Sequence, residues 1–286
     1  MTNPDVVVEG LAFGEGPRWR DGRLWFSDMH AGVVQTFDPG TGALTMVAEV
    51  PGTPSGLGWD PAGRLLIVSM DERRLLRLSG DGALDEVADL SGYTDFPIND
   101  MVVSAAGTAY IGGFGFDLHG GGTPVDTVML AVDTADGSHR VAATDLAFPN
   151  GMVITPDGST LIVGESFGAR LTAFTIDAGG ALQDRRVWAS LGDSGAFPDG
   201  CCLDADGCIW IASPGTHECV RVREGGEVLA RISTGDRLAI ACMLGDDDRR
   251  SLYILSSKGL DPQKARELRS GRLERVRVDV PGAGLP

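Results

Sequence analysis

The amino-acid sequence predicts an all-β protein: a six-bladed β-propeller with four antiparallel strands in each blade. Two observations carry this prediction. A strand–turn–strand pattern recurs six times at a spacing of roughly 45 residues, a period typical of propeller repeats. The 286 residues also include 41 glycines and 15 prolines, which indicates many turns between short strands.

Each repeat opens with a hairpin whose turn is short and polar. Glycine suits such turns because it adopts positive φ without steric cost. Five hairpins have a glycine there, at Asp21-Gly22, Ala62-Gly63, Ala106-Gly107, Asp157-Gly158 and Asp206-Gly207. The second strand of every hairpin carries a bulky side chain at the equivalent position, namely Trp25, Leu66, Tyr110, Ile162, Trp210 and Tyr253. Aromatic and branched residues of this kind favour half-buried strands.

Further strands lie between the hairpins. The stretches 33–37 and 44–50 have strand character after the first hairpin, and 75–78 and 84–90 have it after the second. Each repeat therefore predicts a four-stranded antiparallel sheet, the unit of a propeller blade. A β-sandwich with coincidental turns is the alternative, and six hairpins in regular order argue against it. No linker interrupts the repeats, so residues 1–286 are expected to form a single domain.

The two ends of the chain predict how the ring closes. The sixth hairpin is followed by only one further strand, 272–280, so the last sheet lacks a strand. The stretch 6–11 precedes the first hairpin and has no sheet of its own. We therefore expect the N-terminal strand to complete the last blade, which would remove an open sheet edge.

Composition and charge narrow the range of partners. The chain has 24 lysines and arginines against 40 aspartates and glutamates, a net charge of −16 that repels phosphate backbones and anionic lipid. Nucleic acid and membrane surfaces are therefore not expected as partners. The five cysteines are odd in number and form no C-x-x-C pair, so they are expected to be reduced, buried thiols. With no signal-peptide pattern at the start and no long apolar run, a cytoplasmic location is expected.

The residue that opens the first strand of each repeat occupies an equivalent place in all six. The column reads Glu15, Ser55, Asn99, Asn150, Asp199 and Ala241. In a propeller this strand lines the central channel, so the column converges on the axis at one face. Carboxylate and amide oxygens without sulfur or imidazole suit a hard divalent cation, calcium first, then magnesium or manganese. Asn and Asp before glycine are also common turn formers, but Glu15 is a poor one.

Three phrases of the sequence resemble a known family. GEGPRW at 14–19, FPNGMVITPDG at 148–158 and FPDGCCLDADG at 197–207 are similar to the senescence marker protein / gluconolactonase / luciferin-regenerating enzyme family, the regucalcin-like propellers. The resemblance covers essentially the whole chain. It implies a six-bladed propeller with one divalent cation at the mouth of the channel, and many members hydrolyse lactones.

The resemblance also implies roles for single residues. Glu15, Asn150 and Asp199 match the three metal ligands, Asn99 matches a residue that contacts metal or substrate, and Asp199 matches the general base. Calcium is the expected cation, with zinc, manganese, magnesium and iron(II) as other candidates. Sugar-lactone members usually have an arginine two residues before the Asn99 position, and here it is Pro97. The expected substrate is therefore a lactone or related ester with few hydroxyl groups.

The loops that join second to third strands open on the same face as the column. They contribute candidate substrate-binding residues: His30, Phe114, His119 and His217. An exposed loop histidine is also often a bystander, so these assignments depend on where the loops lie. The expected partner is a small-molecule substrate, bound by a monomer or a small homo-oligomer.

Three functions are compatible with this reading. The leading one is a metal-dependent lactone hydrolase. The second is an organophosphate hydrolase of the diisopropyl fluorophosphatase type, in which the same cation would polarise a phosphoryl oxygen. The third is a propeller that binds a ligand and catalyses nothing, since fold alone does not determine function. The convergence of four oxygen-bearing side chains on one axis argues against the third.

Overall fold

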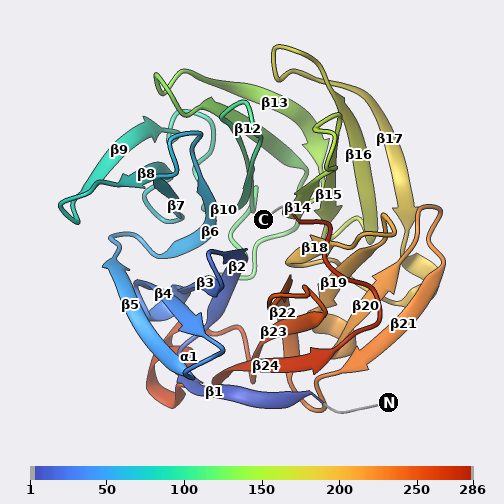
Figure 1. The fold of residues 1–286 in the computed structure, drawn as a ribbon. Helices are drawn as coiled ribbons and strands as arrows, with labels where there is room; N and C mark the ends of the chain where they lie inside the picture. The colour runs from blue at the N-terminus through green and yellow to red at the C-terminus, as the bar shows by residue number, and fades with distance from the viewer. Residues whose placement is uncertain (1–3, 285–286) are drawn as a thin grey trace.

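Six antiparallel sheets of four strands form a ring around a central axis in the computed structural model, which describes residues 4–284 (Figure 1). Within five of the sheets, the strands follow one another in chain order from the axis outward. The predicted six-bladed β-propeller is confirmed.

The blades are numbered from the first complete sheet. Blade 1 contains β2 (Gly14–Arg20), β3 (Arg23–Asp28), β4 (Val33–Asp38) and β5 (Ala43–Glu49). Blade 2 contains β6 (Pro54–Trp59), β7 (Leu65–Ser69), β8 (Arg74–Leu78) and β9 (Leu84–Asp89). Blade 3 contains β10 (Ile98–Val103), β11 (Thr108–Gly113), β12 (Thr127–Asp133) and β13 (His139–Leu146).

The second half of the ring repeats this order. Blade 4 contains β14 (Pro149–Ile154), β15 (Thr160–Glu165), β16 (Arg170–Ile176) and β17 (Leu182–Ser190). Blade 5 contains β18 (Cys201–Leu203), β19 (Ile209–Ser213), β20 (Glu218–Val222) and β21 (Val228–Ser233). Blade 6 contains β22 (Leu238–Gly245), β23 (Ser251–Ser257), β24 (Gly271–Arg277) and β1 (Asp5–Leu11). The short helices are η1 (Met29–Ala31), η2 (Gly192–Ser194), η3 (Pro214–Thr216) and α1 (Pro262–Leu268).

The N-terminal strand closes the ring as predicted. β1 pairs antiparallel with β24, from Asp5 opposite Arg275 to Leu11 opposite Gly271, and so forms the outer strand of blade 6. The chain then turns into blade 1, where the backbone N–H groups of Ala12 and Phe13 donate to the buried carboxylate of Asp28. This carboxylate therefore joins the closing strand to the first blade.

Glycines allow the inner strands to approach one another at the axis. A Cβ atom on Gly56 would lie 2.4 Å from the backbone nitrogen of Met101, and one on Gly151 would lie 2.3 Å from the carbonyl oxygen of Asp199. Both glycines follow a residue of the predicted column. The inner strands of blades 1 to 4 also have register irregularities at these points. The Asn-Gly step of blade 4 therefore lies in such an irregularity inside β14, and is not a turn between strands.

Aromatic side chains pack between neighbouring blades. Trp19 of β2 stacks on Tyr253 of β23, with ring centroids 5.8 Å apart, and Trp25 meets Trp59 edge to face at 5.5 Å. The five cysteines are free thiols and all are buried, as expected. Across residues 4–284, no helix combines the length and the apolar character that crossing a membrane requires.

Candidate functional site

Oxygen-bearing side chains from four blades line one cavity of about 200 Å³. Glu15, Asn99 and Asn150 lie near the starts of β2, β10 and β14, and Asp199 lies just before β18. They meet because the inner strand of each blade enters the ring at the same face. The loops between second and third strands lie at that face too, since the strands of each blade are antiparallel.

A chain of hydrogen bonds connects the amide side chains of the site. Ser55 Oγ donates to Asn99 Oδ1 over 3.1 Å, and Asn99 Nδ2 donates to Asn150 Oδ1 over 3.1 Å. Asn150 Nδ2 in turn donates to Ser166 Oγ over 3.2 Å, and Ser166 donates to the Pro198 carbonyl over 2.6 Å. The column residue Ser55 therefore orients Asn99, and the two amides have fixed positions relative to each other.

Two carboxylates, Glu15 and Asp199, line the cavity, and the negative charge of the buried Asp100 acts on both. Burial, followed by the negative charges of Asp199 and Asp100, raises the pKa of Glu15 well above its usual value. Burial, followed by the charge of Asp100, raises the pKa of Asp199 to about 8. The Gly16 N–H donates to Glu15 Oε2 over 2.7 Å and opposes this effect. Without a counter-charge, these groups cannot all be ionised at neutral pH at low cost.

One buried arginine balances part of this charge. The Arg18 guanidinium lies 3.5 Å from Asp100 Oδ1 and donates to the carbonyl oxygens of Leu57, Pro17 and Met101. Arg18 and Asp100 side chains are each only 3% exposed. The positive charge of Arg18 compensates the negative charge of Asp100. The two negative charges of Glu15 and Asp199 then remain, and they match one doubly charged cation.

The donor set also fits a hard cation. No lysine or arginine appears among the described residues that line the cavity. Within residues 4–284, no group of three or more His, Cys, Asp and Glu side chains is arranged to hold an ion. A cation here would therefore need the amide oxygens as well as the carboxylates, and such all-oxygen sets are typical of calcium, magnesium and manganese sites.

The structure brings three of the four loop residues predicted to bind substrate to this cavity. His30, Phe114 and His119 line it, whereas His217 does not. The backbone of His217 ends η3 with φ of 56°, and Pro214 and Gly215 of the same loop form the wall instead.

His30 is held in an apolar setting within the wall. Its ring centroid lies 5.1 Å from that of Phe13. Burial, with smaller contributions from the charges of Arg266 and His119, lowers the pKa of His30 to about 4. This imidazole is therefore neutral at neutral pH and cannot carry a positive charge toward a substrate there.

Three phenylalanines that line the cavity were not among the predicted site residues, although they occupy the same position in three repeats. Phe13, Phe148 and Phe197 each precede a predicted metal ligand by two positions, and all three line the cavity. In each of these three repeats the phenylalanine and the oxygen-bearing residue two positions later line the same cavity, so an aromatic column accompanies the oxygen column. The sequence does carry a signal for them: in all three repeats, Ala-Phe is followed, after one residue, by Glu, Asn or Asp.

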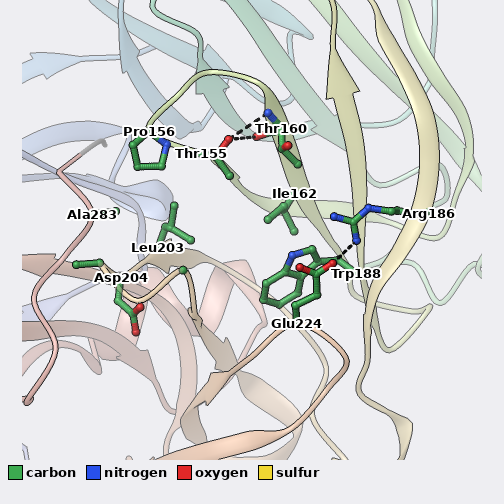
Figure 2. A pocket seen from close by; sticks show the side chains of 12 residues that line it. Thr155, Pro156, Thr160, Ile162, Arg186, Trp188, Leu203, Asp204, Glu224 and Ala283 are labelled. Carbon is green, nitrogen blue, oxygen red and sulfur yellow. Dashed lines mark hydrogen bonds and ion pairs between the residues drawn. The ribbon is translucent and has the colours of Figure 1, made fainter.

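A second cavity lies at the opposite face of the ring. It has a volume of about 450 Å³ and lies among turns of blades 4 and 5 and the C-terminal segment (Figure 2). Its polar side chains have protein partners: Arg186 pairs with Glu224, and Thr155 Oγ1 accepts the Thr160 N–H. Asp204 is likewise paired with Arg221. We assign these groups to the packing of the two blades.

Comparison with known proteins agrees with the fold and the motifs. The family model described as SMP-30/Gluconolactonase/LRE-like region matches residues 13–258. A 6-deoxy-6-sulfogluconolactonase of Pseudomonas putida is 27% identical over 290 residues, covering 98% of this chain and 96% of its own. The pentonolactonase XacC of Haloferax volcanii is 27% identical over 262 residues, covering 91% and 86% of the two chains.

Solved structures show the same fold. A luciferin-regenerating enzyme superposes with a TM-score of 0.82 at 20% identity, covering 98% of this chain and 97% of its own. A calcium-binding protein named regucalcin, from Agrobacterium tumefaciens, superposes with a TM-score of 0.81 at 21% identity, covering 100% and 96%. Since the family model spans most of the chain, this protein belongs to the SMP-30/gluconolactonase/LRE-like family.

Proposed function

We propose that this protein hydrolyses a lactone, and that Glu15, Asn150 and Asp199 hold a divalent cation at the floor of the cavity. The observation that carries the proposal is the pair of carboxylates, Glu15 and Asp199, that Arg18 leaves unbalanced beside two amide side chains. Relatives named as lactonases support the same reaction, including a gluconolactonase of Zymomonas mobilis that is 23% identical over 274 residues.

The cation would supply one kind of chemistry, the polarisation of the lactone carbonyl and the stabilisation of negative charge on its oxygen. Calcium is the first candidate because every donor is a hard oxygen and the cavity opens at the mouth of the ring. A regucalcin of Xenopus laevis is also related, at 26% identity over 296 residues.

The chain's own residues would move the proton. In this proposal, the Asp199 carboxylate accepts a proton from water while the water oxygen bonds to the carbonyl carbon of the lactone. The ring C–O bond then breaks, and the proton held by Asp199 passes to the oxygen that leaves. The product is a hydroxy acid. Asn99, held by Ser55 and Asn150, orients the substrate without adding charge.

The substrate would have few hydroxyl groups. Most of the side chains above the carboxylates are apolar, among them Phe114, Phe148 and Phe167. A polyhydroxylated ring would have to bury hydroxyls against these side chains.

The proposal is tested by a lactone panel assayed with and without a chelator. Asp199→Asn should lower kcat by about a thousandfold, because the proton acceptor is removed. Asp71→Asn is the matched control, since Asp71 is an exposed carboxylate after β7, near the same face, and activity should be retained. Elemental analysis of purified protein should find about one divalent ion per chain, and less in Glu15→Gln.

Two results would contradict the proposal. If a chelator left lactone turnover unchanged, the cation would play no part in the reaction. If phosphotriesters alone were hydrolysed, the organophosphate alternative would replace the lactonase.

A further inference from the structure

The cavity above the carboxylates is walled by phenylalanines that support one another. The rings of Phe114 and Phe148 stack with centroids 4.7 Å apart. Phe167 meets Phe148 edge to face at 5.5 Å, and it meets Phe116 at 5.3 Å. We call the three rings that line the cavity, Phe114, Phe148 and Phe167, the aromatic wall; Phe116 does not line the cavity and packs against Phe148 and Phe167. Because each ring packs against at least one other, the wall has a defined shape before any ligand binds.

Three large apolar side chains remain exposed at the mouth of this same cavity. Phe167 is 48% exposed, Phe197 is 47% exposed and Leu260 is 46% exposed, and all three line the cavity. They come from the loops of blades 4 and 6 and from the segment that leads into blade 5. Exposed apolar groups gathered at one concave place indicate a surface that is covered when a ligand binds.

The wall offers a substrate few hydrogen-bonding groups. Ser166 lines the cavity, but its hydroxyl already donates to Pro198 and accepts from Asn150. The rings of His30 and His119 also line the cavity and can exchange hydrogen bonds, but the rings of Phe148, Phe167 and Phe197, which line it as well, carry no polar group. A substrate hydroxyl buried among the phenylalanines would lose water without gaining a partner, which is unfavourable.

The polar and apolar parts belong to one continuous cavity of about 200 Å³. This volume is below the roughly 300–1,000 Å³ of pockets that enclose drug-sized ligands. A small lactone therefore fits the enclosed part, and a substituent can reach the exposed side chains at its rim. The carboxylates and amides at the floor face the polar end of the ligand, and the aromatic wall faces the rest.

We infer that the substrate is a small lactone that carries one apolar substituent, a phenyl ring or a short alkyl chain, which lies between the aromatic wall and Phe197. The inference rests on the proposed lactonase function and deepens it. The lactone carbonyl lies over Glu15, Asn150 and Asp199, and the substituent covers Phe167. Water attack and ring opening proceed as above, and the product is a hydroxy acid with the same apolar group.

The test compares three δ-lactones of equal ring size: bare δ-valerolactone, its phenyl-substituted derivative and glucono-δ-lactone. Each kcat/KM is divided by the uncatalysed hydrolysis rate, so that differences in ring reactivity cancel. We expect the phenyl-substituted lactone to exceed both others by about tenfold or more, the range that a well-packed apolar group provides.

Variants of the exposed Phe167 then test whether the preference for the phenyl-substituted lactone arises at the aromatic wall. Phe167→Ser should lower the ratio of phenyl-substituted to bare lactone by about tenfold. Phe167→Leu should keep most of that ratio because it remains apolar. Met46→Ala is the control: Met46 is 57% exposed on β5, and its loss should change neither the ratio nor the activity. Phe167 is half exposed, so these variants should fold.

The outcomes separate the two proposals. Preference for glucono-δ-lactone, or a ratio that Phe167→Ser leaves unchanged, would overturn the substrate class and leave the lactonase standing. Failure to hydrolyse any of the three lactones, with the metal bound, would overturn the proposed function itself.

Discussion

Arg18 is the residue on which the charge balance of the axis depends. Its guanidinium is enclosed by protein, pairs with Asp100 and donates to three backbone carbonyls. A buried pair of this kind contributes little net stability by itself, but removing one partner leaves a charge buried without compensation. The pair is therefore best understood as the means by which Asp100 is tolerated beside Glu15 and Asp199.

This role predicts a stability effect for Arg18→Met. The unfolding free energy should fall by about 3 kcal/mol, because Asp100 then stays buried without its partner. The double variant Arg18→Met/Asp100→Asn should recover much of that loss, as measured by urea denaturation. Arg223→Met removes an arginine from an exposed pair with Glu227 and should change stability by less than about 1 kcal/mol. Equal losses in the single and double variants would contradict the assignment.

At the scale of single residues, the sequence predicted part of the site. Glu15, Asn99, Asn150 and Asp199 were found because each opens its repeat at the same position. The Arg18–Asp100 pair could not be found this way, since its members are 82 positions apart and belong to different positions of the repeat. His217 belongs to a loop that reaches the cavity, but Pro214 and Gly215 of that loop line it and His217, which follows η3, does not.

Among the structural elements, the N-terminal strand β1 joins the two ends of the ring. It supplies the outer strand of blade 6, pairs with β24 and ends at the buried Leu11. Glu9 of β1 also forms an ion pair with Arg272 of β24 at 2.7 Å. Without β1, the outer edge of β24 would present unpaired backbone groups, and the ring would be joined only through side-chain packing.

Deleting residues 1–11 should therefore lower the melting temperature by about 10 °C or more, measured by differential scanning calorimetry. Deleting residues 1–4 leaves β1 intact and serves as the matched control, with a change of no more than about 2 °C expected. A melting temperature unchanged in the longer deletion would show that closure by β1 does not stabilise the ring.

Element boundaries were predicted less well than the elements themselves. The strand expected at 272–280 ends at Arg277 in β24, and the Val278 N–H adds one more hydrogen bond in the same register, to the Arg250 carbonyl. The stretch that follows crosses to blade 5, where the Ala283 N–H donates to Leu203 and the Ala205 N–H donates to Pro281. The sequence remains strand-like as far as Val280, but residues 279 and 280 belong to no strand.

At the scale of the whole molecule, the ring concentrates negative charge at its axis, and this couples pH to stability. The usual pKa of an aspartate is 3.8, but that of Asp199 is raised to about 8 in the folded chain without a cation. The folded state therefore holds a proton that the unfolded state releases. Between these two pH values, Asp199 therefore makes the metal-free protein less stable as pH rises.

The melting temperature of the metal-free protein should accordingly fall by about 5 °C or more between pH 5 and pH 8. Calcium should raise the melting temperature more at pH 8 than at pH 5, because at the lower pH protons compete for the same oxygens. Asp199→Asn removes one of the two titrating carboxylates and should make the profile less steep, with Glu15, whose pKa is also raised, responsible for the remainder. A calcium effect of equal size at both pH values would contradict the proposed ligands.

The sequence by itself determined the six-bladed ring, its closure by the N-terminal strand and the oxygen-bearing column at the axis. These features are encoded locally, because strand periodicity, turn glycines and repeat positions act over a few neighbouring residues. Only the tertiary structure decided which loop residues reach the cavity, that Arg18 compensates Asp100 and that phenylalanines from blades 3 and 4 form one wall. Those features arise from packing between segments distant along the chain, and close packing depends on the shape and burial of every neighbour.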